Sequence, residues 1–526
     1  MKLLRYKYVP SAMVATILYS LLNVLHAYSL SFLVVDTISQ LISNFLVVLM
    51  IYIAYSLALY FKMRRTALAE SYLTEMFSQI NSHYFANQSF QEFHKLEHGE
   101  HLSSYINDIP KIIELTLKKY LNLIEMATMA IASFIALCNI HYTMGILAFI
   151  SFTLMSVVPK LFQSRLSNYI SGLQTQKAQY TSKMRELLQG FTTFFENQAF
   201  PIFLKKAQLA TTKYANYLLE TQTFTGLMSA TLTFVNALVS LLSIVYVSYL
   251  VLTGQVAAGA LLAVLSLVPE FGSAVIQLIS EREFYQSGVH LFKERLPFAL
   301  GQYQIPKYQV NVEPSKTFHT LKLTNITLPY KKILKLPDIT FSLGQNYAIV
   351  GESGSGKSSL LKILIGEIDY YQGEVWLDQQ LKNPKHHLFS MVSYMNQETF
   401  LFNDTIKNNI DLLGTLSNTE VQNLLTQVGL GNLTPEMMIQ DNGKNLSGGQ
   451  RQRIAFARAI ARKKDILILD EACANLDAQS AQIIEKLAFQ SAKTVLMITH
   501  QMSEEVKAKT TLIHIKDDSN DQCEIN

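Results

Sequence analysis

Six long apolar stretches before residue 280 constrain the fold of this chain more than any other feature. They cover residues 9–35, 41–61, 121–140, 144–158, 224–252 and 257–279. A helix of about 17–25 apolar residues crosses a bilayer, because it rises about 1.5 Å per residue and satisfies its own backbone hydrogen bonds. The fourth stretch lies near the lower limit of that range. We therefore predict a membrane α-helical domain with six transmembrane helices over residues 1–290.

The first stretch has the basic start of a secretory signal, because Lys2, Arg5 and Lys7 precede it. However, its apolar run is much longer than the roughly 7–15 residues of a signal peptide, and no small-residue cleavage site follows it. We therefore interpret it as an uncleaved first transmembrane helix.

Basic residues set the expected orientation of the six spans. The short links 36–40, 141–143 and 253–255 contain no Lys or Arg, whereas the N-terminus and the segments 62–120 and 159–223 are rich in both. Lys and Arg are retained on the cytoplasmic side of membranes. We expect a multi-pass protein of the bacterial plasma (inner) membrane, with both termini and both long loops in the cytoplasm.

The two long loops have apolar residues at helical spacing, for example Leu68, Tyr72 and Phe77 in the first. This pattern predicts that transmembrane helices continue into the cytoplasm, where about 25 residues would reach on the order of 35–40 Å. Such arms would carry a mechanical signal to the membrane. The alternative is a pair of surface helical hairpins without a partner.

A few polar side chains fall within the spans, namely Asn23, His26, Glu125, Asn236 and Glu270. Ionisable groups inside a membrane usually face a cavity or another polar group. Glu270 follows Pro269 and either contacts a cationic or amphipathic cargo or pairs with a basic neighbour. His26 and Glu125 are interpreted as contacts between helices, without a ligand.

A change of pattern marks a domain boundary at residues 291–314. Apolar periodicity stops there, and Gly301, Pro306 and Pro314 appear. From 315 to 526, short β-type runs alternate with helical segments, which predicts an α/β domain with a parallel sheet.

The strongest motif of this second domain is Gly351-Glu352-Ser353-Gly354-Ser355-Gly356-Lys357-Ser358. It fits the phosphate-binding loop of P-loop NTPases and lies between an apolar run, 347–350, and a helical segment, 359–364. The glycines let backbone N–H groups face a triphosphate, Lys357 would reach its β/γ-phosphates, and the Ser358 hydroxyl would hold Mg²⁺. The expected ATP-binding residues here are Gly351, Ser353, Gly354, Ser355, Gly356, Lys357, Ser358 and Ser359.

A second motif, Leu446-Ser447-Gly448-Gly449-Gln450, follows downstream. Together with the six spans and the domain order, it makes the chain resemble an ABC transporter half of the exporter-fold type over nearly its whole length. The resemblance implies an ABC-type nucleotide-binding domain and a dimer, homomeric or heteromeric, with ATP between its subunits. Ser447, Gly448, Gly449 and Gln450 would complete the ATP site of the opposite subunit.

The same resemblance implies roles for several other residues. The apolar run 466–469 ends in Asp470 and Glu471, of which the first would hold Mg²⁺ and the second would be the general base. Gln397 would touch Mg²⁺ and sense the γ-phosphate, His500 would contact the γ-phosphate, and Tyr330 would stack on adenine. The implied metal ligands are Ser358, Gln397 and Asp470. Coupling segments are expected near 81–85 and 189–194.

These features predict an ATP hydrolase coupled to transport, which exports an amphipathic drug, lipid or peptide by alternating access. The alternative is an exporter-fold importer of a metal chelate or siderophore. The six spans argue against a soluble ABC-type ATPase. A regulatory membrane protein whose ATPase gates a channel remains a further alternative.

The net charge is only +4 and no basic cluster is interleaved with aromatics, so we expect no nucleic-acid partner. Cys138, Cys473 and Cys523 have neither metal-site nor disulfide spacing.

Overall fold

The computed structural model describes residues 6–96, 98–296, 319–329, 334–352, 354–378, 380–382, 391–397, 399–473, 476–499 and 503–515. The chain forms two compact units. A helical unit contains Met1–Asn87 and Glu97–Ile305, and an α/β unit contains Gln88–Leu96 and Pro306–Asn526.

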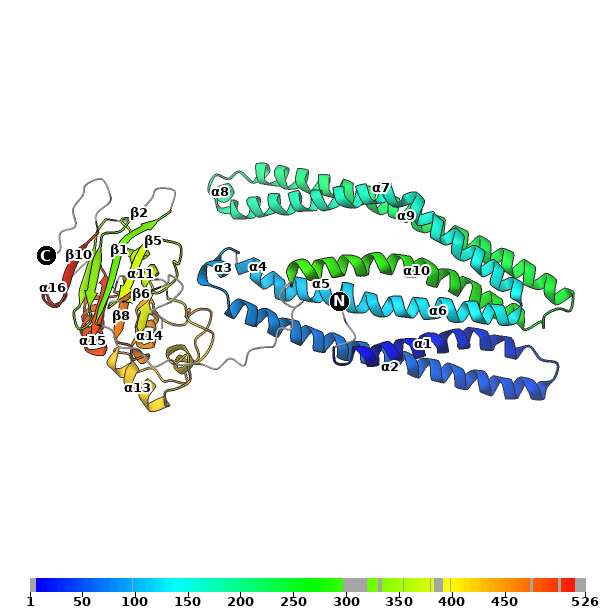
Figure 1. Ribbon diagram of the computed structural model, residues 1–526, viewed down its shortest axis with the longest axis horizontal. Coiled ribbons are helices and arrows are strands. Elements are labelled where there is room, and N and C mark those ends of the chain that lie inside the picture. Colours follow the sequence, from blue (N-terminus) through cyan, green and yellow to red (C-terminus); the bar gives the residue numbers. More distant parts are fainter. Residues whose placement is uncertain are drawn as a thin grey trace. The chain divides into compact units, whose positions relative to one another are not determined.

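The helical unit is built from long helices joined by short links (Figure 1). These are α1 (Val9–Ser29), η2 (Leu30–Leu33), α2 (Ile38–Ala86), α4 (His98–Ser103), η3 (Ser104–Asp108), α5 (Ile109–Ile113), η4 (Glu114–Lys118), α6 (Lys119–Ile140), α7 (Tyr142–Gln189), α8 (Phe191–Glu196), α9 (Phe200–Leu252) and α10 (Ala260–Arg295). Within the described residues, six helical segments are long and apolar enough to cross a membrane. The expected six-helix domain is therefore confirmed.

Three of these helices are much longer than a bilayer requires. α2, α7 and α9 contain 49, 48 and 53 residues, where about 20 residues suffice to span the hydrocarbon core. Each continues beyond its apolar stretch without a break, which confirms the predicted helical extensions.

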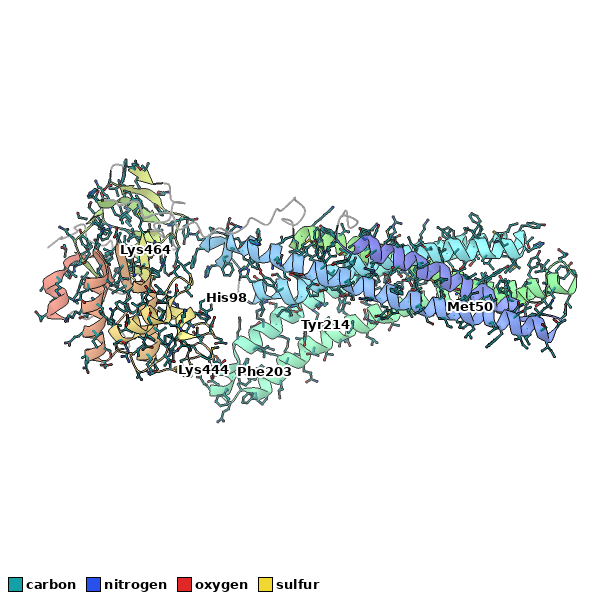
Figure 2. The ribbon with its side chains drawn as sticks, turned by 90° about the horizontal axis from the view of Figure 1, so that it is seen from below. Met50, His98, Phe203, Tyr214, Lys444 and Lys464 are labelled. Carbon is teal, nitrogen blue, oxygen red and sulfur yellow. The ribbon has the colours of Figure 1, made fainter. Side chains whose placement is uncertain are left out.

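Large apolar side chains cover the outside of the helical unit as well as its interior. Leu137, Met155 and Leu267 lie in a buried cluster between helices, whereas Met50 on α2 is 62% exposed and points outward (Figure 2). A helix that is apolar on both its packed and its outer faces is typical of a membrane span.

The helices of this unit associate mainly in pairs, α1 with α2, α6 with α10, and α7 with α9. α7 and α9 lie side by side along their length, and α8 connects them at one end (Figure 1). At that end the pair stands apart from the other helices in both views (Figures 1 and 2).

The α/β unit contains two sheets. Its strands are β1 (Thr320–Leu328), β2 (Leu334–Lys335), β3 (Ile339–Ser342), β4 (Tyr347–Val350), β5 (Gln372–Leu377), β6 (Gln380–Lys382), β7 (Val392–Met395), β8 (Ile466–Asp470), β9 (Thr494–Ile498) and β10 (Thr511–His514). The predicted parallel sheet is present in the order β10-β4-β9-β8-β7. A second sheet, β2-β1-β5-β6 with β3 on β1, is antiparallel and was not predicted.

The two sheets differ because of burial. β1 alternates buried and more exposed residues, which suits an antiparallel strand with one solvated face. β8 is buried throughout, and its successive residues enter two cores: Ile466 and Ile468 belong to one cluster, and Leu467 and Leu469 to the other.

The helices of the α/β unit are α3 (Phe90–His94), α11 (Lys357–Leu364), α12 (Ile406–Ile410), α13 (Asn418–Gln427), α14 (Gly448–Ala461), α15 (Ala478–Ser491) and α16 (Glu504–Lys509).

The first expected coupling segment lies within a long helix. Residues 81–85 form the end of α2, because the buried stripe of Leu73, Phe77 and Ile80 carries the helix on to Ala86. The short helix after it is α3, which begins with a capping box of Ser89 and Glu92 and belongs to the α/β unit. The second expected segment, 189–194, overlaps α8.

Candidate nucleotide-binding site

The phosphate-binding loop connects the buried strand β4 to α11 in the parallel sheet. Gly354 and Gly356 have φ values of 86° and 101°, a left-handed conformation that side chains with a Cβ rarely adopt. A Cβ on Gly356 would also lie 2.9 Å from the side chains of Leu334 and Leu336. Glycine is therefore required where the loop turns into α11.

Lys357 is almost fully buried, at 7% exposed, and lies across its own loop. Its ammonium group donates hydrogen bonds to the carbonyl oxygens of Gly351, at 2.7 Å, and Glu352, at 2.8 Å. The Ser355 hydroxyl is buried and, among the described residues, has no hydrogen-bond partner. A buried cation, an unsatisfied hydroxyl and the N-terminus of α11 together suit a phosphate group.

The other residues of the loop differ in their exposure. Ser358 is exposed and Ser359 half-buried at the start of α11, and Gly354 is exposed. Ser353 lies outside the described residues, as do Tyr330 and His500.

Asp470 lies at the carboxyl end of β8 and is only 4% exposed. Burial raises the pKa of its carboxyl group, the hydroxyl of Tyr394 opposes that change, and the charge of Glu471 adds to it. The Tyr394 hydroxyl donates to Oδ2 of Asp470 at 3.3 Å. Sequence reasoning missed Tyr394, although it lies on β7, the strand that leads to Gln397.

Glu471 and Gln397 are brought together by the sheet. β7 and β8 are adjacent and parallel, so the residues after them emerge at the same edge. Nε2 of Gln397 donates to Oε2 of Glu471 at 2.7 Å. The Glu471 backbone has a φ of 50°, and its N–H donates to the Ile498 carbonyl at 3.1 Å.

The second motif forms the start of α14. Ser447 is the N-cap, and its hydroxyl accepts from the Gln450 N–H at 3.2 Å while the Gln450 side chain accepts from the Ser447 N–H at 2.9 Å. Ser447 and Gly448 are exposed, and Gly449 and Gln450 are half-buried. In the described part of this chain, no hydrogen bond or ion pair joins these residues to the loop 351–358.

The polar residues of the spans make specific pairs. Glu125 forms an ion pair with Lys62 at 2.5 Å, and the Glu270 carboxylate accepts a hydrogen bond from the Asn23 side chain. The recorded partner of Glu270 is thus an amide and not the basic neighbour considered above. Nδ2 of Asn236 donates to the Pro269 carbonyl at 3.4 Å.

Comparison with known families separates the chain in the same way. The family described as ABC transporter transmembrane region matches residues 8–274, which is half of the chain. The family described as ABC transporter matches residues 334–474.

Three curated relatives illustrate the range of similar proteins. An ATP-dependent lipid A-core flippase of Sodalis glossinidius is 36% identical over 42% of this chain and 40% of its own length. The multidrug resistance-like ATP-binding protein MdlB of Buchnera aphidicola is 26% identical over 81% of this chain and 76% of its own length. A putative export ATP-binding/permease protein of Rickettsia bellii is 25% identical over 91% and 86%.

The alignment with the flippase thus covers well under two thirds of that relative, whereas the two more distant alignments cover most of both chains. Both family matches occur in one chain, in the order expected from its sequence, and coincide with the membrane-length helices and the phosphate-binding loop. The protein belongs to the ABC transporter family.

Proposed function

We propose that this protein is one half of an ATP-driven transporter, which exports an amphipathic drug, lipid or peptide by alternating access in a dimer. The observation that carries the proposal is the hydrogen bond between Gln397 and Glu471. It lies at the carboxyl edge of the parallel sheet, where the phosphate-binding loop also begins. This bond joins the two residues that we propose as the γ-phosphate sensor and the general base. The same chain contains six membrane-length helices in its described part.

The loop residues support ATP as the substrate of this site. Lys357 would exchange its two carbonyl contacts for phosphate oxygens, which are stronger acceptors for an ammonium group. The Ser355 hydroxyl and the free N–H groups at the start of α11 would bind the same phosphates. Ser353, Ser359 and, for the adenine ring, Tyr330 complete the proposed set.

The donor set also fits Mg²⁺, which prefers oxygen ligands and is commonly held by a carboxylate together with phosphates. Asp470, Ser358 and the side-chain oxygen of Gln397 would hold it. When bound, the ion would neutralise negative charge that develops on the phosphates. The hydroxyl of the half-buried Tyr394 would keep the Asp470 carboxylate oriented for this role.

Glu471 would act as the general base and accept a proton from the attacking water. The Gln397 amide donates to one oxygen of this carboxylate and would help to orient it toward the water. His500 would contact the γ-phosphate.

The dimer is supported by the outward placement of the second motif. Ser447 and Gly448 are exposed at the N-terminus of α14, where a helix start suits the phosphate of another subunit's nucleotide. The partner is a second copy of this chain or a related half-transporter. α3 and α8 are the proposed coupling elements, and α8 carries Phe195, which is 63% exposed.

The direction and the substrate class are supported by resemblance to the relatives. They include a protein named as a lipid A-core flippase, one named as multidrug resistance-like, one named as a lactococcin-A transport/processing protein and one named as a putative export protein. A lipid, drug resistance and export appear among these names, whereas a further relative is named as a glutathione/L-cysteine transport system protein.

The test is transport in vesicles of defined orientation, with labelled lipid, drug and peptide probes. Glu471→Gln should slow ATP hydrolysis by at least about 100-fold, abolish transport and retain ATP binding, because the base is lost but the phosphate contacts remain. Glu504→Gln, an exposed position on α16, is the matched control and should behave as wild type.

Normal hydrolysis by Glu471→Gln would remove the base assignment. Probe movement toward the side where ATP is hydrolysed would favour the importer. Probe flux that is independent of hydrolysis would favour a gated channel.

A further inference from the structure

A ladder of aromatic rings lies between α1 and α2 in the membrane-spanning part of the helical unit. The rings of Tyr19 and Tyr55 stack with centroids 5.4 Å apart. His26 stacks on Tyr55 at 5.0 Å and contacts Tyr52 at 4.0 Å. Tyr52 is 38% exposed, and the other three rings are half-buried, so the ladder keeps an accessible side.

A carboxylate of a third helix contacts the face of α1 that carries two of these rings. Tyr19, Asn23 and His26 share one face of α1, because they are spaced by four and three residues. Asn23 donates to the Glu270 carboxylate of α10 from the middle of that face. We define Tyr19, Asn23, His26, Tyr52, Tyr55 and Glu270 as the aromatic–carboxylate cluster.

The two carboxylates near this ladder, of which Glu125 is buried and Glu270 half-buried, differ in how their charge is balanced. Glu125 is paired with Lys62, and the Lys62 ammonium also lies 4.4 Å from the centroid of the Tyr19 ring. Glu270 has a neutral amide as its partner, and within the described residues it takes part in no ion pair. A neutral amide orients a carboxylate but leaves its charge without compensation, which is costly inside a membrane.

The contact of Lys62 with Tyr19 shows that the ladder accommodates a positive charge. Aromatic faces attract cations through their quadrupole, and most strongly where water is excluded. Among the described residues, no lysine or arginine lies over the rings of Tyr52, Tyr55 or His26. Those rings and the Glu270 carboxylate are therefore available to a cation from outside the chain.

We propose that the aromatic–carboxylate cluster binds a lipophilic organic cation, with a quaternary or protonated-amine centre on an apolar body. Its charge would face Glu270, and its body would lie along the rings of Tyr52 and Tyr55. A divalent metal ion is a poor fit, because it requires several oxygen ligands and the cluster has one carboxylate. The inference names the substrate class of the proposed transport function and rests on that proposal.

Binding of labelled tetraphenylphosphonium to the full-length protein in lipid nanodiscs tests this site. Glu270→Gln should weaken binding by at least about tenfold, because it removes the charge and retains an acceptor for Asn23. Glu270→Asp keeps the charge and should recover most of the affinity. Glu283→Gln, an exposed position on the same helix, should bind as wild type.

A ring variant and a probe of opposite charge complete the design. Tyr55→Leu should weaken binding and Tyr55→Phe should retain it, because only the second keeps the aromatic face. Tetraphenylborate has the same shape and a negative charge, so its binding should not fall in Glu270→Gln.

Equal affinity of wild type and Glu270→Gln for tetraphenylphosphonium, or no binding by wild type, would overturn the inference. Export of a neutral or anionic solute by vesicles, together with cation binding that does not depend on Glu270, would also overturn the inference. The proposed transport function would then be retained. Glu270-dependent binding without ATP-driven movement of any probe would instead overturn the transport function and support the site.

Discussion

At the scale of single residues, Glu471 combines a catalytic side-chain type with an uncommon backbone. Its φ of 50° is left-handed although it is not glycine, and such a conformation costs about 1–3 kcal/mol unless neighbours hold it. The N–H bond to Ile498 and the Gln397 amide provide that support. The apolar run before Asp470 predicted carboxylates at the end of a strand, but no local pattern predicted this conformation.

Cys473 leads to a prediction about reactivity at the same scale. Burial raises the pKa of its thiol to about 12, and the nearby Glu485 adds to the effect because it disfavours a second negative charge. At pH 8 only about one thiol in ten thousand is then ionised, and the thiolate is the reactive form. Iodoacetamide should therefore leave Cys473 unmodified in the folded protein at pH 8, as measured by mass spectrometry of its peptide.

The rate of alkylation at Cys473 should keep rising with pH through 10. The urea-unfolded chain is the control, and its Cys473 should react readily at pH 8.5, near the ordinary thiol pKa of about 8.5. Fast labelling of the folded protein with a plateau near pH 9 would contradict the prediction.

At the scale of helices, the contact between α9 and α10 depends on Gly272. A Cβ at this position would overlap the Asn236 side chain of α9 and lie 2.9 Å from the terminal methyl group of Met155 on α7. We expect Gly272→Ala to lower stability by about 1–3 kcal/mol, because the methyl group would displace the Asn236 side chain, which donates to the Pro269 carbonyl, and the end of the Met155 side chain. Thermal unfolding of the detergent-solubilised protein measures this change.

Gly226 on α9 provides the matched control. A Cβ there would meet no atom within 4 Å. Gly226→Ala should leave the stability unchanged or raise it by up to about 1 kcal/mol, because alanine is the better helix former. The packing argument fails if the two variants lose stability equally.

The start of α14 has a capping role and a proposed phosphate-binding role, which a pair of variants separates. Ser447 caps the helix, so Ser447→Ala should destabilise the protein by about 1 kcal/mol. Ser447→Asp preserves a good N-cap and should unfold at the wild-type temperature, but its charge would repel a phosphate. We therefore expect Ser447→Asp to lose ATPase activity at normal stability, measured by phosphate release and thermal unfolding in parallel. ATPase activity close to wild type would show that Ser447 acts as a cap alone.

At the scale of the whole molecule, the exposed second motif predicts ATP sites that are shared between subunits. Lys357→Ala and Ser447→Asp should each inactivate both sites of a homodimer. Co-expression of the two variants should restore activity in the mixed dimer, because one site then has an intact loop from one chain and an intact motif from the other. Two differently tagged chains, purified in tandem, permit phosphate release to be measured on the mixed dimer alone.

Recovery toward half of the wild-type activity is the expected result if the sites act independently. No recovery in the tandem-purified mixed dimer would contradict shared sites between two copies of this chain. A tandem purification that yields no mixed dimer would indicate a different partner subunit.

Local sequence was sufficient to predict the features that depend on neighbouring residues along the chain. The six spans follow from the length of apolar runs, the extended helices from helical spacing, and the phosphate-binding loop from its glycines. The parallel sheet also followed from local pattern, but the antiparallel sheet did not, because strands as short as β2 and β6 carry little periodicity.

Contacts between side chains that are far apart along the chain became known only from the three-dimensional fold. Gln397 and Glu471 are 74 positions apart, and Asn23 and Glu270 are 247 positions apart. The resemblance assigned Gln397 and Glu471 to one ATP site but did not predict their mutual hydrogen bond. The sequence listed Asn23 without a partner and left Glu270 open between a cargo and a basic neighbour. The physical reason is that a hydrogen bond requires its two groups within about 3 Å, and strand order and helix packing alone bring such groups that close.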